Sequence, residues 1–467
     1  MKNIFTILFI FFNISLISSQ SIEGNWKGSL DVMGQKLALV FHIENKNGKL
    51  ISTMDSPDQN AFGIPVENTS FENSILTIEL PKLKIKYTGN SNTEFSEING
   101  KFNQNGTEFP LILNRKELEK PKFNRPQTPK EPFPYTVEEV SFKNSIDNIT
   151  LAGTLTLPNS KGKFPVVILI SGSGPQDRNE ELFEHKPFAV IADDLTKKGI
   201  AVLRYDDRGY GKSTGDFSNS TTADFANDVR SAIEFLKTRS EINNKKIGLV
   251  GHSEGGMIAP MVAANSKDVN FIVLLAGPGT PIDELMIEQS KAYSKLLGVD
   301  ESTIEINSRI QKSTYDFVKN YKSDNLQNDL MSYLKSEIEK LPESIKPKTE
   351  DEIDQMVLQL ADSVNNKWFL FFIKYIPAEY ISKLKCDVLA MNGSLDFQVP
   401  AKTNLKAIEN ALIVGNNKNY EIVELAGLNH LFQEATTGSL EEYSKIEQTF
   451  SPKALTLMSD WIIKKTK

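Results

Sequence analysis

The sequence predicts an α/β protein, with a mostly parallel sheet, helices on both faces and a helical cap, preceded by a small antiparallel β domain. Two observations lead to this fold class. From about residue 135 onward, continuous apolar runs alternate with amphipathic helical segments, which is typical of parallel strands buried on both faces. Before residue 116, short runs of alternating apolar and polar residues are separated by turns rich in Asn and Gly, as in an antiparallel meander.

Length and charge narrow the class of protein. A chain of 467 residues is long enough for two domains, or for one domain with large insertions. The formal net charge is −7 and no basic stripe stands out, which argues against nucleic acid or an anionic membrane as a partner. The single cysteine, Cys386, has no partner for an internal disulfide, so the folded core alone is expected to stabilise the protein.

Residues 1–19 have the pattern of a secretory signal peptide. Lys2 supplies the positive start, residues 4–17 are mostly apolar, and Ser18-Ser19 offers small residues for cleavage before Gln20. The apolar segment is too short and too interrupted for a good membrane span. No cysteine lies near the cleavage point, which argues against a lipid anchor. We therefore expect an exported protein, periplasmic or secreted, without stable membrane insertion; an uncleaved N-terminal anchor is the alternative.

Residues 20–115 are expected to form a small β-barrel or sandwich domain. They contain no cluster of titratable residues suited to catalysis, and His42, on a predicted strand, is interpreted as structural. Residues 116–134 carry prolines among Lys and Glu, a composition typical of a linker that stays extended and buries little. Because every catalytic candidate lies beyond this linker, we expect the β domain to be an accessory unit.

Residues 135–467 are expected to form the α/β domain. The pattern opens with a hairpin over residues 138–155, and an amphipathic helix is predicted from Phe225 to Lys237. The strongest strand candidates are Val166–Ile170, Ile200–Tyr205, Ile247–Val250, Phe271–Leu275 and Val388–Met391, and a further strand is expected at Tyr420–Glu424. Between about residues 281 and 384 charged helical sequence replaces the strand rhythm, which predicts a cap over the C-terminal edge of the sheet. The aromatic residues 368–372 either line an acyl pocket or pack within that cap.

The segment Gly251-His252-Ser253-Glu254-Gly255 stands between a predicted strand and a predicted helix. A serine in such a sharp turn presents its hydroxyl above the sheet, and the residues two before and two after it must lack bulk. This is the geometry of a nucleophile turn. A second Gly-x-Ser-x-Gly run around Ser213 has no strand before it and is interpreted as a loop; it is not a phosphate-binding loop either, because Asp206 stands where that motif requires glycine.

A serine nucleophile needs a base, and the chain has four histidines. His42 lies in the β domain, and His252 is held within the turn and points elsewhere. His430 follows the last predicted strand, where a loop can place its ring above Ser253. His430 is the predicted base, and His185, in a polar loop before the nucleophile, is the weaker alternative.

The predicted acid is Asp396, the carboxylate at the end of the strand before His430, where it would orient the imidazole. An Asx turn or a helix cap is the alternative role for this residue. The backbone amide of Glu254 and one from the Gly-rich loop 171–178, for which Ser173 is our choice, are expected to form an oxyanion hole. The side chains of Glu254, Asp177 and Arg178 are interpreted as structural partners of one another or of this loop.

The order Ser-Asp-His, the strand before Gly-x-Ser-x-Gly and the cap before the acid's strand together resemble the α/β-hydrolase superfamily. Within it, the segments SGSGPQDRN (171–179), RYDDRGYGKS (204–213) and GHSEGG (251–256) resemble bacterial carboxylesterases related to the serine aminopeptidase-like hydrolases. The resemblance covers residues 135–467. The histidine that the family usually has before the oxyanion glycine is Ser171 here.

The resemblance implies an α/β-hydrolase fold and hydrolysis of a small-molecule carboxylic ester through an acyl-enzyme. Ser253 would attack, His430 would shuttle the proton, and water would then release the acid. No metal or other cofactor is implied, and no cluster in the sequence has metal-ligand spacing. The alternatives are a serine peptidase or aminopeptidase, which would need an acidic group for the substrate amine, and a non-catalytic binding protein on the same fold.

Overall fold

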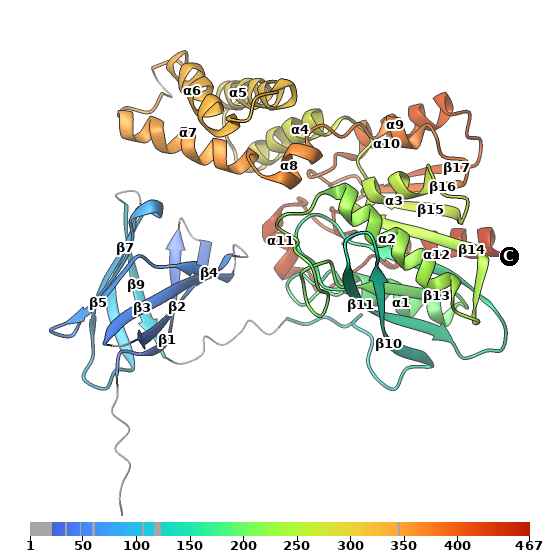
Figure 1. Cartoon of the computed structure of the whole chain (residues 1–467), viewed down its shortest axis with the longest axis horizontal. Helices are drawn as coiled ribbons and strands as arrows, with labels where there is room; N and C mark the ends of the chain where they lie inside the picture. The colour runs from blue at the N-terminus through green and yellow to red at the C-terminus, as the bar shows by residue number, and fades with distance from the viewer. Residues whose placement is uncertain are drawn as a thin grey trace, which may run out of the picture. The chain divides into compact units, whose positions relative to one another are not determined.

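The computed structural model describes residues 21–32, 35–46, 48–57, 61–104, 107–115, 123–343 and 346–467. The chain divides into two compact units, residues 1–122 and 123–467 (Figure 1). The expected signal peptide, residues 1–19, and residues 116–122 of the expected linker lie outside the described residues. Across the described residues, none of the helices combines the length and the apolar character needed to cross a bilayer.

The first unit is a nine-stranded antiparallel sheet in the order β4-β3-β2-β1-β9-β8-β7-β6-β5. The sheet curls on itself, and contacts with β3 show this. The amide of Val66 donates to the carbonyl of Ser52 on β3, and the hydroxyl of Ser52 forms a hydrogen bond with the hydroxyl of Thr69 on β5. The strands are β1 (Gly24–Val32), β2 (Gln35–Lys46), β3 (Lys49–Ser56), β4 (Ala61–Pro65), β5 (Asn68–Glu72), β6 (Ile75–Leu80), β7 (Ile85–Ser91), β8 (Glu97–Gln104) and β9 (Thr107–Asn114), with a short 3₁₀ helix, η2 (Pro81–Leu83).

The inside of this sheet is filled by large side chains. Alternate residues of each strand point to one face, and Trp26, Phe41, Tyr87 and Phe102 are almost completely buried there. His42 faces the other way and contacts its neighbours Asn25 and Asp55 at 2.8 and 2.7 Å, as expected of a structural histidine. This unit is therefore a curled β domain with a packed interior.

The second unit contains an eight-stranded sheet in the order β10-β11-β13-β12-β14-β15-β16-β17. β10 and β11 pair antiparallel with each other and β11 with β13, and from β13 to β17 every pairing is parallel. The strands are β10 (Tyr135–Asn144), β11 (Ile149–Pro158), β12 (Phe164–Ile170), β13 (Ala201–Tyr205), β14 (Ile242–His252), β15 (Val269–Leu275), β16 (Asp387–Gly393) and β17 (Tyr420–Leu425). The sheet is the mostly parallel one that the apolar runs predicted.

Helices cover both faces of this sheet (Figure 1). Val166 and Ile168 of β12 pack in one core with residues of α2, α3 and α10, whereas Val167 and Leu169 pack in a second core with α1 and α12. The helices that flank the sheet or follow it are α1 (Pro187–Lys197), α2 (Thr222–Lys237), α3 (Gly255–Ala263), α10 (Ala401–Val414), α11 (Leu440–Lys445) and α12 (Pro452–Thr466). Strands buried on both faces explain why their sequences are continuously apolar.

The cap is inserted between β15 and β16, as predicted for residues 281–384, and appears in yellow to orange in Figure 1. Its interior includes Leu330, Leu334 and Ile338, which recur at helical spacing along α6 and are completely buried. The cap helices are α4 (Ile282–Leu296), α5 (Glu301–Asn320), α6 (Leu326–Glu339), α7 (Glu350–Val364), α8 (Lys367–Phe372) and α9 (Ala378–Ile381).

Residues 123–134 differ from the extended, unburied linker that their composition predicts. The guanidinium of Arg125 donates to the backbone carbonyls of Phe183, Ser444 and Ile446 at 3.0, 3.0 and 2.7 Å, and Arg125 is 9% exposed. Gln127 accepts from the backbone amides of residues 449 and 450 at 2.6 and 3.0 Å. This segment therefore belongs to the second unit, where it satisfies backbone groups that lie about 320 residues further along the chain.

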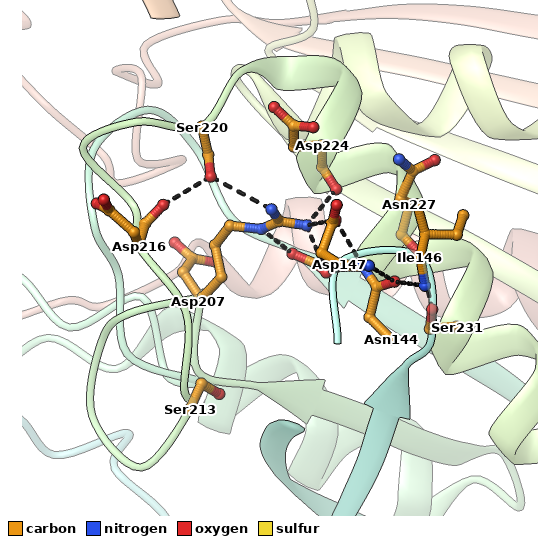
Figure 2. A network of polar contacts seen from close by, with 12 residues as sticks. Asn144, Ile146, Asp147, Asp207, Ser213, Asp216, Ser220, Asp224, Asn227 and Ser231 are labelled. Carbon is orange, nitrogen blue, oxygen red and sulfur yellow. Dashed lines mark hydrogen bonds and ion pairs between the residues drawn. The ribbon is translucent and has the colours of Figure 1, made fainter. Parts of the chain in front are cut away.

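A buried polar network fixes the loop after β13 to the β10–β11 turn and to α2 (Figure 2). The Arg208 guanidinium contacts the Asp228 carboxylate at 2.7 and 2.9 Å and the Asp147 carboxylate at 2.8 Å. It also donates to the hydroxyl of Ser220 at 3.2 Å, and Asn144 donates to Asp228 at 2.7 Å. The network holds the loop after β13, whose first residues, Asp206 and Asp207, contact the loop after β12.

Replacing Arg208 by alanine is expected to lower the free energy of unfolding by about 3–5 kcal/mol, since it leaves the buried carboxylate of Asp228 without its counter-charge. The side chains of Arg208 and Asp228 are 5% and 3% exposed. Lys212→Ala is a matched control, because that ammonium is 77% exposed and lies 3.6 Å from Glu139. Urea unfolding of both variants measures the difference, and equal losses would contradict a stabilising role for the network.

Candidate active site

The candidate residues lie at one edge of the second sheet. Ser253, Asp396 and His430 follow β14, β16 and β17, and the loop 171–178 follows β12. These strands are parallel to one another in the sheet, so their carboxyl ends lie at the same edge, where ligands of open α/β sheets usually bind.

The turn at Ser253 has the predicted geometry. β14 ends directly before it, α3 begins two residues later, and the φ angle of Ser253 is +53°, in the left-handed region that costs an L residue roughly 1–2 kcal/mol. A Cβ atom on Gly251 would lie 2.0 Å from the carbonyl oxygen of Gly255, and one on Gly255 would lie 2.2 Å from that of Ile170. Glycine is therefore required two residues before and two residues after the serine.

His430 and Asp396 are paired. The Nδ1 atom of His430 lies 2.8 Å from Oδ2 of Asp396, and both side chains are buried. The other carboxylate oxygen of Asp396 accepts from the backbone amides of Gln398 and Val399 at 2.8 and 2.9 Å. Asp396 thus makes the Asx-type turn and contacts the imidazole at the same time, each with a different oxygen. A proton on Nδ1 leaves Nε2 of His430 as the acceptor nitrogen.

His430 is connected to the nucleophile turn through His252. The Nε2 atom of His252 lies 3.0 Å from the backbone carbonyl oxygen of His430, and the centroids of the two rings are 4.8 Å apart. Within the described part of the chain, no hydrogen bond joins the Ser253 hydroxyl to the His430 ring. The serine–histidine contact that proton transfer requires is therefore part of the proposal below.

The loop after β12 lies against the nucleophile turn. A Cβ atom on Gly172 would come within 3.2 Å of Cβ of Ser253, so a side chain here would crowd the serine. The amide of Gly172 donates to Oε1 of Glu180 at 2.7 Å. Because this amide is already engaged, the next one, that of Ser173, remains our candidate donor to an oxyanion, together with the amide of Glu254 at the start of α3.

Two acidic residues that sequence reasoning did not select hold this loop. Asp207 accepts from the hydroxyl of Ser171 at 2.8 Å and from the amide of Gln176 at 2.9 Å, and burial raises the pKa of its carboxyl well above the usual range. Asp206 contacts the Arg178 side chain at 2.9 and 2.8 Å and its amide at 3.0 Å. The Asp-Asp-Arg segment 206–208 was the signal in the sequence for these contacts. Its partners could not be inferred from it, because they are distant along the chain.

The side chain of Glu254 links the nucleophile turn to α2 and to the cap. Its carboxylate accepts from the Thr222 hydroxyl at 2.6 Å and from the Trp368 indole at 3.0 and 3.2 Å, and burial raises the pKa of this carboxyl. The prediction of a structural role agrees with these contacts, and Glu254 also contacts the side chain of Ser173 in the loop after β12, as predicted. Phe369 and Phe372 are buried, so packing within the cap accounts for these two aromatic residues.

The weaker alternatives are engaged elsewhere. The ring nitrogens of His185 each lie 2.9 Å from an oxygen, the hydroxyl of Thr449 and the carbonyl of Tyr443, and burial lowers the pKa of His185 to about 4. The hydroxyl of Ser213 donates to the carbonyl of Asp206 at 2.7 Å, as a structural loop serine does. In the part of the chain that the structure describes, no group of three or more His, Cys, Asp or Glu side chains is placed to hold a metal ion.

Comparison with known families and proteins gives matches to hydrolases. Residues 184–335 match the family described as serine aminopeptidase, S33, and this segment includes Ser253 but ends before Asp396 and His430. Esterase EstD of Thermotoga maritima is 33% identical over 181 residues, which is 38% of this chain and 43% of that protein, so the chain matches less than half of the relative's length. An uncharacterised 31.7 kDa protein of Escherichia coli is 26% identical over 273 residues, covering 58% of this chain and 86% of that protein.

Among solved structures, an esterase of Pyrococcus furiosus, Pf2001, is 15% identical and covers 74% of this chain and 99% of its own, with a TM-score of 0.42. The hypothetical protein PA2218 of Pseudomonas aeruginosa is 16% identical and covers 75% of this chain and 100% of its own, with a TM-score of 0.43.

Proposed function

We propose that the chain is an esterase-like α/β hydrolase, as its matches to a serine aminopeptidase family and to an esterase support, and that it hydrolyses carboxylic esters through an acyl-enzyme formed on Ser253. The observation that carries the proposal is the strained turn at Ser253, on the same sheet edge as the buried His430–Asp396 pair. A strained backbone at a serine and a buried histidine–carboxylate pair both cost folding free energy, which the rest of the fold must offset. A site for acyl transfer accounts for the presence of both.

In the proposed reaction, Nε2 of His430 takes the proton of the Ser253 hydroxyl as its oxygen attacks the ester carbonyl. Asp396 holds the Nδ1 proton and stabilises the imidazolium. The oxyanion accepts hydrogen bonds from the amides of Ser173 and Glu254. The tetrahedral intermediate then expels the alcohol, which takes the proton from His430. A water molecule, deprotonated by the same imidazole, then attacks the acyl-enzyme, and the second tetrahedral intermediate releases the carboxylic acid while the proton on His430 returns to the oxygen of Ser253.

The hydrogen bonds and the burial of the Glu254 carboxyl favour an ester over a peptide with a free amine as the substrate. An aminopeptidase needs a carboxylate that can pair with the substrate ammonium. Glu254 adjoins the nucleophile, but one of its oxygens accepts from both Thr222 and Trp368 and the other accepts from Trp368. With a pKa raised by burial, this carboxyl is a poor partner for an ammonium group.

The proposal is tested by assaying a short-chain p-nitrophenyl ester and an aminoacyl p-nitroanilide side by side. We expect kcat/KM for the ester to exceed that for the anilide, because the Glu254 carboxyl beside the nucleophile is already hydrogen bonded to Thr222 and Trp368. A preference for the anilide would establish the peptidase alternative instead. Failure to turn over either substrate, together with no labelling by a serine-directed phosphonate, would leave a non-catalytic binding protein.

A further inference from the structure

His252, which directly precedes the nucleophile, has an acceptor at each ring nitrogen. Its Nδ1 atom lies 2.9 Å from Oε1 of Glu180, and its Nε2 atom lies 3.0 Å from the carbonyl oxygen of His430. A carbonyl and an ionised carboxylate accept but do not donate, so when Glu180 is ionised both nitrogens carry hydrogen and the ring is an imidazolium. The side chains of Glu180 and His252 are each 8% exposed, so this charge pair is buried.

Glu180 joins His252 to the oxyanion loop. The same oxygen, Oε1, accepts from the amide of Gly172 at 2.7 Å. Glu180 has a φ angle of +52°, in the left-handed region that residues with a side chain rarely adopt. The strain falls at the residue whose carboxylate reaches both the loop and the imidazolium, and the reaction steps above assign Glu180 no role.

The charges around His252 stabilise its protonated form. Burial opposes the charge, but the carboxylate of Glu180, the carbonyl of His430 and the more distant carboxylate of Asp396 outweigh it, so the pKa of His252 is raised. The titratable groups facing this ring are thus Glu180, Asp396 and the ring of His430 itself, at 4.8 Å between centroids. The stability that the pair contributes is complete below about pH 6.5 and is lost as pH rises through the raised pKa.

We propose that Glu180 and His252 form a positioning pair that fixes the oxyanion loop and the loop of His430 against the nucleophile turn. A continuous path runs from the Gly172 amide through Glu180 and His252 to the backbone of His430. An oxyanion donor or a base displaced by about 1 Å costs roughly 100-fold in rate. The pair acts through other residues, so its role is positioning, and the inference rests on the esterase function proposed above.

The test compares Glu180→Gln with Glu181→Gln in the full-length protein. Glutamine keeps an acceptor for the Gly172 amide but removes the charge that stabilises the imidazolium. Glu181 is the adjacent control, since its side chain is 37% exposed and pairs with Lys186 at 3.3 Å. We expect Glu180→Gln to lower kcat for a short p-nitrophenyl ester by roughly 100-fold with KM changed less than about threefold, because geometry in the transition state is what is lost. Glu181→Gln should match the unmodified protein.

The pH dependence of kcat provides a readout that a merely structural residue would not change. As pH rises through the raised pKa of His252, the bridge to His430 loses its charge, so kcat should fall at alkaline pH. In Glu180→Gln this fall should move to lower pH, because the stabilising carboxylate is gone. If Glu180→Gln has the same kcat as Glu181→Gln, and if kcat of the two variants falls at the same alkaline pH, the positioning role is wrong.

Nuclear magnetic resonance of the unmodified protein labelled with ¹⁵N-histidine covers the case in which Glu180→Gln does not fold. Two protonated nitrogens on His252 at neutral pH would support the pair, and a neutral tautomer would overturn it. Phosphonate labelling of the unmodified protein separates the two proposals. Absence of both labelling and ester turnover would reject the esterase function, whereas an active protein with a neutral His252 would reject only the positioning pair.

Discussion

Replacing Ser253 by alanine is expected to lower kcat/KM for a short-chain ester by roughly 10⁶-fold, as loss of a triad serine does, while the protein remains folded. Without the hydroxyl no acyl-enzyme forms, and neither His430 nor the oxyanion donors can replace the missing nucleophile. Alanine fits in place of serine in the left-handed turn with a similar strain, so the melting temperature should change little.

Ser213→Ala is the matched control for this change, because it removes the serine from the other Gly-x-Ser-x-Gly run of the chain. Its hydroxyl bonds to the backbone of Asp206, so this variant is expected to lose stability but to retain turnover while folded. Full activity in Ser253→Ala, with loss of activity in folded Ser213→Ala, would show that the nucleophile has been assigned to the wrong serine.

Replacing Asp396 by asparagine is expected to lower kcat by something on the order of 10⁴-fold, if the precedent of serine proteases holds. Asparagine can still accept from the amides of Gln398 and Val399, so the turn should survive. The amide cannot stabilise an imidazolium and favours the wrong tautomer of His430. Circular dichroism and steady-state kinetics on the same preparation separate a loss of folding from a loss of catalysis.

Glutamine at Glu421 or Glu424 provides the comparison, since these carboxylates lie on β17, close to His430 in sequence, and are exposed. Both changes should have little effect on kcat. A large loss of kcat on replacing either glutamate, together with little effect of Asp396→Asn on kcat, would place the acid on β17 and overturn the assignment.

The parts of the fold that sequence reasoning predicted are those with a local signal. Continuous apolar runs predicted β12 through β16 because the central residues of these strands are buried on both faces, and charged helical sequence predicted the cap between β15 and β16. The glycines around Ser253 predicted the turn because the backbone there leaves no room for a Cβ atom. Asp396 and His430 were identified from their order and from their places after strands, and the structure pairs them at 2.8 Å.

The rest could not be predicted because the contacts join residues that are distant in sequence. Arg125 lies in a proline-rich segment that reads as an unburied linker, yet its partners include the carbonyl of Ile446. Glu180 has no motif of its own, and its role depends on a left-handed backbone that brings its carboxylate to Gly172 and His252. Such a conformation follows from tertiary packing, and one sequence contains no periodic signal for it.

The most direct test of Ser253 as the nucleophile is to locate the covalent adduct that a serine-directed phosphonate ester forms with the native, full-length protein. Peptide mapping by mass spectrometry after complete inactivation identifies the modified residue. We expect one equivalent of phosphonate on Ser253, with loss of ester turnover in proportion to labelling. Complete inactivation with the adduct on any other residue, or ester turnover that persists when Ser253 is fully labelled, would contradict it.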